Sequence, residues 1–440
     1  MSCYAPIVKK LRDELLWEVD DLNIAVENAR QYNIPELEKY GVTTGRGFLD
    51  FANWLVQGWI PTETTKGRDI YYILCIFYFV LNQPPLDVRQ TQIDPSCVSK
   101  KLSPLSRWVV EFAQHIGKRM DEPGSANEAS LTGFRNAPTF RVFESDYTPP
   151  LCDAAGQGVR TECVEKQQQG VTNKEFENFN QFFCRQLKIP RPIAGENDHK
   201  TVVFPADSTF AGAYEITDDA EVDLKGLKWR VADLIQDEEL AKKFKGGVWM
   251  HCFLNTFDYH RQHAPVSGKV KRAQVIKGAA YLEVVVKKDE NTGDNFLDPC
   301  RRLDQKDKDA GSVHTVDAPD NPGYQFLQTR GIIVIENEKI GNVAVLPIGM
   351  AQVSSVKLHE CGHYQLEGQE LKKGEEISHF EFGGSDCVLL FEPKARVSNF
   401  PNSRSKTHFF YGEKLATSHY DKPVSSRDDF EENYIAVEKN

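Results

Sequence analysis

The chain has 440 residues and a net charge of −11, from 53 Lys and Arg against 64 Asp and Glu. Hydrophobic residues make up 40% and aromatic residues 11% of the chain, which is enough for sizeable cores and excludes a disordered, collagen-like or coiled-coil protein. The acidic balance disfavours nucleic acid and anionic membrane surfaces as partners. The length predicts two or three domains.

The first residues carry no apolar stretch of the kind found in a secretory signal. The longest apolar run, Ile70–Leu81, is shorter than the roughly 20 residues that a membrane span needs. We therefore expect a buried helix there and no membrane anchor. The ten cysteines are scattered without a C-x-x-C pair, so we expect reduced thiols in a cytoplasmic protein.

Residues 1–120 show the apolar spacing of helices, for example at Leu11, Leu15 and Val19 and again at Phe48 and Leu55. They predict a helical N-terminal domain. From residue 121 to 173 the composition shifts to Gly, Pro, Ser, Thr, Asn and Gln, which predicts a polar linker or surface excursion.

Residues 174–421 have the sequence pattern of a β-rich domain. After one helix-like stretch at Phe176–Leu187, short runs rich in Val and Ile alternate with turn residues. The expected strands include Thr201–Phe204, Val248–Leu254, Tyr281–Val286, Gly331–Ile335, Val343–Ile348 and Cys387–Phe391. Residues 288–322 read as a solvated loop and residues 422–440 as a polar tail. The sequence therefore predicts an α+β fold, with a helical N-terminal domain followed by a β-rich C-terminal domain.

The residues with chemical potential lie in this second domain. His260 and His263 follow Asp258 and Tyr259, so two imidazoles near a carboxylate supply proton donors and acceptors at neutral pH. In an extended chain these two histidines would face opposite ways and serve separate roles. A pair of histidines bonded to backbone, or an incidental metal site, is the alternative.

Two further patterns are weak when taken alone. Gly383-Gly384-Ser385 precedes the strand Cys387–Phe391, and most such tripeptides are ordinary turns. His359-Glu360-Cys361-Gly362-His363 fits the zinc-protease signature H-E-x-x-H, which requires a helix. The β-like run before it and Gly362 within it predict a strand edge and turn instead, and we expect no metal.

Taken together and in order, five motifs resemble the phosphatidylserine decarboxylase family. They are Phe182-Phe183-Cys184-Arg185-Gln186-Leu187 with Arg191-Pro192, Pro205-Ala206-Asp207, Asp258-Tyr259-His260-Arg261-Gln262-His263-Ala264-Pro265, the stretch 345–356, and Lys373-Gly374-Glu375-Glu376 with Phe382-Gly383-Gly384-Ser385. The resemblance covers about residues 174–420, and the G-G-S form is similar to the soluble branch that includes the tryptophan decarboxylase of the psilocybin pathway.

The resemblance implies that the protein cleaves itself between Gly384 and Ser385. Ser385 would attack the Gly384 carbonyl after His263, oriented by Asp207, takes its proton. The ester would then eliminate and hydrolyse to a pyruvoyl cofactor at the new N-terminus, with loss of ammonia. His260 would assist decarboxylation and return a proton to the product.

The chain departs from the commonest family signature, L-G-S-T, because it has Gly383-Gly384-Ser385-Asp386. Its acidity and lack of an anchor favour decarboxylation of a free, aromatic L-amino acid over phosphatidylserine, which is the alternative substrate. An unprocessed binding or scaffold protein is a third possibility, although Asp207, His260, His263 and Ser385 are all present. The resemblance also implies a homodimer.

Overall fold

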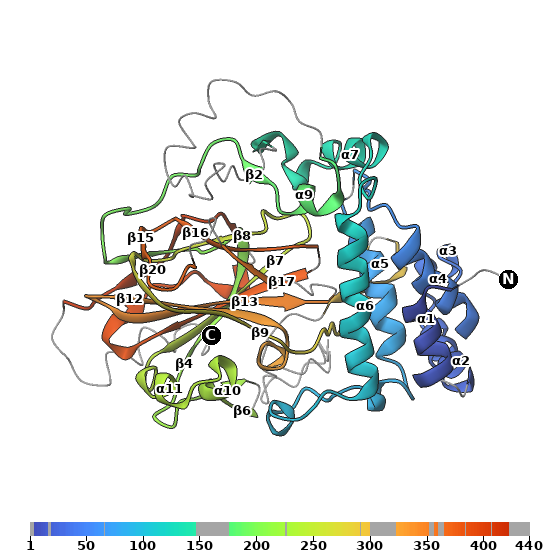
Figure 1. The fold of residues 1–440 in the computed structure, drawn as a ribbon, viewed down its shortest axis with the longest axis horizontal. Coiled ribbons are helices and arrows are strands. Elements are labelled where there is room, and N and C mark those ends of the chain that lie inside the picture. Colours follow the sequence, from blue (N-terminus) through green and yellow to red (C-terminus); the bar gives the residue numbers. More distant parts are fainter. Residues whose placement is uncertain are drawn as a thin grey trace.

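The structure is a computed structural model of the chain. It describes residues 4–15, 19–65, 67–146, 176–224, 227–290, 292–299, 323–351, 356–359, 365–382, 384–405 and 407–421. It has helices in the N-terminal region and a sheet-rich region after them, so the predicted α+β class is confirmed (Figure 1).

The N-terminal helices pack around a single apolar core. Their bounds are α1 Pro6–Lys10, continued by a π-helical turn at Leu11–Leu15, α2 Val19–Arg30, α3 Pro35–Lys39, α4 Gly45–Gln57, α5 Asp69–Leu81, α6 Pro104–Asp121 and α7 Glu128–Arg135. The predicted buried helix is α5, in which ten of the thirteen residues are buried. Its first turn is capped by Glu63, whose carboxylate accepts the N–H groups of Asp69 and Ile70 at 2.9 and 3.1 Å. Within the described residues, no helix is long and apolar enough to cross a membrane.

The expectation of a linker from residue 121 onward is wrong for residues 121–146. Helix α7 lies there, and the rings of Phe134 and Phe140 are buried, with their centroids 4.9 Å apart. The buried apolar residues of this stretch include these two large rings, so few of them suffice to bury it against the helical core. Residues 147–175 lie outside the described part of the chain.

An eight-stranded antiparallel sheet forms the centre of the second region. Its order is β15-β9-β12-β13-β17-β7-β4-β19. The strands are β4 Ser208–Glu215, β7 Val248–Leu254, β9 Gly268–Ile276, β12 Arg330–Asn337, β13 Gly341–Met350, β15 Glu370–Leu371, β17 Gly384–Phe391 and β19 His408–Phe409. The four central strands β12, β13, β17 and β7 are almost wholly buried where described, as their near-continuous apolar sequences predict.

Smaller sheets and helices complete the region. Three-stranded sheets join β14 Val356–Leu358, β16 Glu376–Phe380 and β8 Arg261–His263, and join β18 Val397–Ser398, β20 Lys414–Ser418 and β3 Thr201–Val203. Two-stranded ribbons pair β1 Ser145–Asp146 with β2 Gln186–Leu187, β5 Glu221–Leu224 with β6 Leu227–Arg230, and β10 Val284–Lys288 with β11 Asn295–Pro299. The remaining helices are α9 Phe179–Phe183, α10 Val231–Ile235 and α11 Glu238–Lys243. Short 3₁₀ turns are η2 Asp87–Arg89, η3 Pro95–Cys97, η4 Pro138–Phe140, η5 Val142–Glu144, η6 Tyr324–Phe326, η7 Pro393–Ala395 and η8 Ser403–Ser405.

Most predicted strands are present, with shifted ends. The expected helix at Phe176–Leu187 is shorter, because α9 ends at Phe183 and the chain then turns into β2. The expected loop at residues 288–322 instead begins with the ribbon β10–β11, and residues 300–322 lie outside the described part of the chain, as does the predicted tail 422–440.

The helical domain lies against one end of the sheet, with α5 and α6 facing it (Figure 1). Polar contacts tie the two together. The Asn82 side chain donates to the Leu282 carbonyl at 2.9 Å, and the Asn295 side chain donates to the Tyr32 carbonyl at 2.7 Å. Tyr71 of α5 donates to Asp298 of β11, which also pairs with Lys287. The ribbon β10–β11 therefore docks on the helical domain.

Candidate active site

The predicted cleavage position lies at the start of an interior strand. Gly384 and Ser385 open β17, which pairs with β13 on one side and β7 on the other. The backbone of Ser385 lies opposite Gly349 of β13 and Leu254 of β7. Hydrogen bonds to neighbouring strands on both sides fix the main chain of a strand. The predicted scissile bond therefore lies at the start of a strand whose backbone is held in place.

Phe382, two residues before Gly384, is held by several partners. Its backbone N–H donates to the Asn180 side-chain oxygen at 2.9 Å. Its ring centroid lies 5.3 Å from that of Trp59, 5.2 Å from that of Phe179 and 5.4 Å from that of Phe183. Trp59 belongs to the helical domain, so that domain reaches the chain just before the predicted cleavage position.

His260 belongs to the same aromatic cluster. Its ring is fully buried and stacks on Phe183, with the ring centroids 3.8 Å apart. Because Phe183 also contacts Phe382, one set of rings joins His260 to the segment that enters β17. This is the residue that the sequence predicted as the proton donor of the decarboxylation step.

His263 lies in β8 with a different set of neighbours. Its Nδ1 is 2.8 Å from the Gly374 carbonyl oxygen, and its Nε2 is 3.3 Å from the Tyr259 hydroxyl. A carbonyl can only accept, so Nδ1 carries the proton and Nε2 holds a lone pair. The ring stacks on Tyr411 at 3.8 Å between centroids, and burial lowers the pKa of His263 to about 4. The imidazole is therefore neutral at pH 7, the state that a general base requires.

Asp207 follows β3, and its side chain is buried. Its carboxylate pairs with Arg191 and accepts the backbone N–H of Tyr411 at 3.0 Å. Burial raises the pKa of Asp207 to about 6, against the opposing effect of the Arg191 guanidinium. Tyr411 thus contacts both predicted residues, through its N–H to Asp207 and through its ring to His263.

The structure orients His263 differently from the simple serine-triad arrangement that the resemblance implies. Among the described residues, no hydrogen bond joins Asp207 to His263; the Nδ1–H group of His263 donates to the Gly374 carbonyl instead. His260 and His263 lie against different rings, in line with the separate roles expected from their spacing. The structure describes the backbone of Ser385 and brings its strand to the aromatic cluster around His260.

The region of the H-E-x-x-H pattern begins as a strand edge. Strand β14 ends at Leu358, and His359 then lies with its Nδ1 3.4 Å from a Glu376 oxygen. Burial would raise the pKa of Glu376, but Arg261 and His359 hold it well below its usual range. Residues 360–364 lie outside the described residues, and the described residues contain no cluster of three potential metal ligands.

The sequence motifs assigned no role to several partners of the predicted residues. They are Trp59, Asn180, Phe183, Tyr259, Gly374 and Tyr411. Tyr259, Phe183 and Gly374 stand inside the quoted motifs, so their place in the motif was the available hint. Trp59 lies more than 300 residues before Phe382, and nothing local marks that contact.

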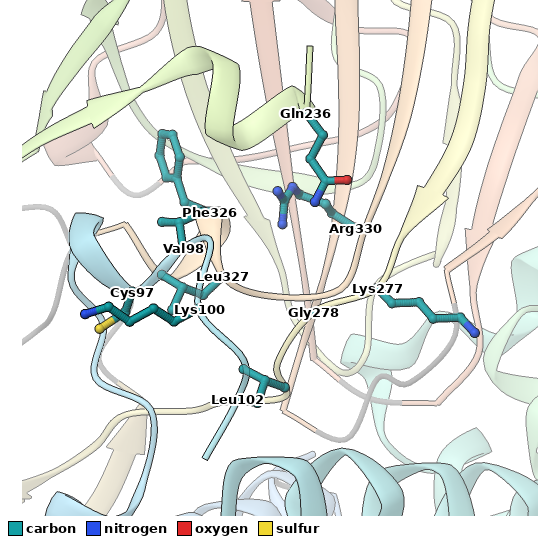
Figure 2. Close-up of a pocket in the computed structure, with 10 residues that line it drawn as sticks. All are labelled: Cys97, Val98, Lys100, Leu102, Gln236, Lys277, Gly278, Phe326, Leu327 and Arg330. Atoms are coloured by element: carbon teal, nitrogen blue, oxygen red, sulfur yellow. The ribbon is translucent and has the colours of Figure 1, made fainter. Parts of the chain in front are cut away.

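A cavity of about 200 Å³ lies apart from these residues (Figure 2). It is lined by Cys97, Val98, Lys100, Leu102, Gln236, Lys277, Gly278, Phe326, Leu327 and Arg330. The Arg330 guanidinium is buried and donates to the backbone carbonyls of Asp233, Leu234 and Gln328. Its donors therefore hold α10 and the start of β12 in place.

Comparison with known proteins gives a consistent result. The family model described as phosphatidylserine decarboxylase matches residues 179–417. The phosphatidylserine decarboxylase proenzyme of Fusobacterium nucleatum is 28% identical over 247 residues, covering 55% of this chain and 70% of that protein.

Two further relatives match about half of the chain. Decarboxylase iboD of Amanita muscaria is 28% identical over 239 residues, covering 52% of this chain and 62% of that protein. The phosphatidylserine decarboxylase proenzyme of Ruminiclostridium cellulolyticum is 26% identical over 219 residues, covering 50% and 61%. The match to the latter two thus spans less than two thirds of their length. The prediction of a carboxy-lyase made as a proenzyme is confirmed at the level of the family. More than half of the chain, including every motif residue from Phe182 to Ser385, falls within the matched segment, and the chain belongs to the phosphatidylserine decarboxylase family.

Proposed function

We propose that this protein cleaves itself between Gly384 and Ser385 and then decarboxylates a free L-amino acid, aromatic in side chain, to the amine and carbon dioxide. The observation that carries the proposal is the place of the Gly384–Ser385 bond. It opens an interior strand, and Phe382 just before it shares one aromatic cluster with His260.

In the cleavage step, His263 is the base. Its neutral Nε2 takes the Ser385 hydroxyl proton, the hydroxyl oxygen attacks the Gly384 carbonyl, and the peptide bond gives way to an ester. In the structure Nε2 lies 3.3 Å from the Tyr259 hydroxyl. In the cleavage step the Ser385 hydroxyl replaces Tyr259 as the hydrogen-bond partner of Nε2. Removal of the Ser385 α-proton releases the Gly384 carboxylate, and water then replaces the nitrogen, which leaves as ammonia.

A pyruvoyl group at position 385 would supply the electron sink for decarboxylation. The strand pairing of β17 holds that position, and the cluster of Phe183 and Phe382 excludes water around His260. His260 then returns a proton to the carbon that has lost carbon dioxide.

Two features support a free amino acid as the substrate: the net charge of the chain and the burial of its apolar helix α5. The chain carries a net charge of −11, and α5, its most apolar helix, is buried inside the helical domain. Neither feature provides a face for an anionic bilayer. We include in the proposal a cytoplasmic location and a homodimer, the latter measurable by sedimentation.

Phosphatidylserine is the second candidate substrate. Two relatives carry that activity in their names, and Phe143 and Ile189 are 71% and 73% exposed beside the β1–β2 ribbon. Exposed apolar side chains of this kind can enter a membrane interface.

The first experiment is the intact mass of the purified protein under denaturing conditions. We expect two chains, residues 1–384 and 385–440, the second lighter than its sequence by the change from serine to pyruvoyl. The Ser385→Ala variant should remain a single chain. A single chain from the unaltered protein would contradict the proposal.

The second experiment chooses the substrate. The cleaved enzyme is given tryptophan, phenylalanine or tyrosine in solution, or phosphatidylserine in vesicles, and the amine product is measured. Activity on vesicles alone, lost in a Phe143→Ser and Ile189→Ser double variant, would instead establish the lipid substrate.

A further inference from the structure

Asp386, the residue after Ser385, has a fully buried carboxylate. The Tyr324 hydroxyl donates to its Oδ2, and the Nε2 atom of His251 lies 3.1 Å from the same oxygen. Tyr324 comes from the 3₁₀ turn η6 and His251 from β7, so two separate elements converge on this side chain. Burying a carboxylate costs free energy unless partners compensate for the lost water, and here the Tyr324 hydroxyl supplies a hydrogen bond.

These contacts join residues that cleavage would place on two different chains. If the chain is cut after Gly384, Tyr324 and His251 remain in the large chain, whereas Asp386 becomes the second residue of the small chain. Asp386 is then the first side chain able to fasten the new end. The carboxylate is closed off from solvent, so a bound substrate has no access to it.

A new chain end needs such a fastening. Terminal residues are poorly ordered unless they are tied down, and a reacting group must be held to within about 0.5 Å for efficient catalysis. Backbone pairing to Ile348 and Phe253 holds Asp386 from the sides. The side-chain contacts with Tyr324 and His251 add a restraint from a third direction.

The geometry points to Asp386 as a positioning residue: its carboxylate, held by Tyr324 and His251, fixes the end of the small chain and thereby the reactive carbonyl made from Ser385. This role rests on the proposed function. It also assigns a physical role to Asp386, one of the two residues at which this chain departs from the commonest family signature. Asp386 acts through residue 385 and does not touch the substrate.

The test uses Tyr324→Phe, Asp386→Ala and Asp386→Asn in the full chain. Cleavage is followed by intact mass, the reactive carbonyls are titrated with phenylhydrazine, and kcat and KM are measured per titrated carbonyl. Tyr78→Phe is the matched control, because it removes a buried tyrosine hydroxyl in α5, far from β17 along the chain. Thermal unfolding of each variant identifies any that fail to fold.

We expect kcat to fall about tenfold in Tyr324→Phe and about 100-fold in Asp386→Ala with KM within twofold, because a misplaced carbonyl reacts slowly while the substrate still binds. Asp386→Asn should stay within about threefold of the unaltered enzyme, because its amide oxygen still accepts the Tyr324 hydroxyl. Tyr78→Phe should change neither constant.

Two results would overturn the positioning role. One is an unchanged kcat in folded Tyr324→Phe and Asp386→Ala. The other is an Asp386→Asn enzyme as slow as Asp386→Ala, which would assign the effect to charge. If the unaltered protein is never cleaved, the proposed function itself fails, and this outcome is distinct because it appears before any variant is made.

Discussion

At the scale of single residues, the site depends on neighbours that set protonation and orientation. His263 is neutral because it is buried, and the Gly374 carbonyl selects the tautomer with a lone pair on Nε2. Tyr411 links it to Asp207, and Phe183 supports His260. The two histidines therefore have different surroundings although only two residues separate them.

This difference predicts that substitutions of the two histidines impair different steps. His263→Ala should slow self-cleavage by at least about 100-fold, because it removes the base. His260→Ala should cleave to completion but lose about 100-fold in kcat, because it lacks only the later proton donor. Intact mass measures the first effect and amine formation the second. Cleavage of His263→Ala at the normal rate would disprove the assigned base.

At the scale of secondary-structure elements, α9 connects the helical domain to the cleavage segment. Its Asn180 side chain donates to Asp121 at the end of α6 at 2.8 Å and accepts the Phe382 N–H at 2.9 Å. One amide group thus joins three segments that are far apart along the chain.

We expect Asn180→Ala to slow self-cleavage about tenfold, because the N–H of Phe382 loses its acceptor and the segment before Gly384 shifts. The matched control is Asn127→Ala, which removes the cap of α7, a side chain with no contact to Phe382. A time course of intact mass after synthesis measures both rates. Equal rates for the two variants would show that Asn180 matters only for general stability.

The start of α5 predicts a dependence of stability on pH. Burial raises the pKa of Glu63 to about 7, although the N–H groups of Asp69 and Ile70 oppose the shift. Because the folded-state pKa lies above the unfolded value, the native state binds more protons between about pH 4.5 and 7, and stability contributed at low pH is lost as the pH rises through 7.

Glu63→Gln removes this loss while keeping an acceptor for the helix. Relative to the unaltered chain, the variant should gain about 2 kcal/mol in free energy of unfolding between pH 5 and pH 8. Urea unfolding of both proteins in the uncleaved Ser385→Ala background measures the difference. An identical pH dependence in the two proteins would refute the raised pKa.

At the scale of the whole molecule, the proposed cleavage position lies where both domains meet the central strand β17. Trp59 of the helical domain contacts Phe382, and β17 lies between β13 and β7 (Figure 1). The small chain would therefore contribute an interior strand to a sheet built mainly by the large chain.

We accordingly expect the two chains to stay together after cleavage. Size-exclusion chromatography without denaturant should give one species that contains both chains, and only denaturant should separate them, because leaving would expose the buried strand β17. The Ser385→Ala protein provides the reference elution volume. Release of residues 385–440 under native conditions would contradict the position of β17.

Much of this architecture could be predicted from the sequence. The spacing of apolar residues predicted α4, the continuous apolar run predicted α5, and short apolar runs predicted the strands β7, β13 and β17, because these patterns reflect which local conformation buries the apolar groups. The same reading missed α7, since the sparse apolar residues near Phe134 are few but large. The order of the motifs identified the family, and with it the candidates Asp207, His260, His263 and Ser385.

The sequence by itself determined most of the elements, the family and the chemical groups present, because the patterns that encode them lie in residues close together along the chain. Only the tertiary structure decided their partners: Gly374 and Tyr411 around His263, Trp59 and Asn180 around Phe382, and Tyr324 and His251 around Asp386. Those contacts join residues tens to hundreds of positions apart. They arise from the packing of whole strands and helices, and no local pattern encodes them.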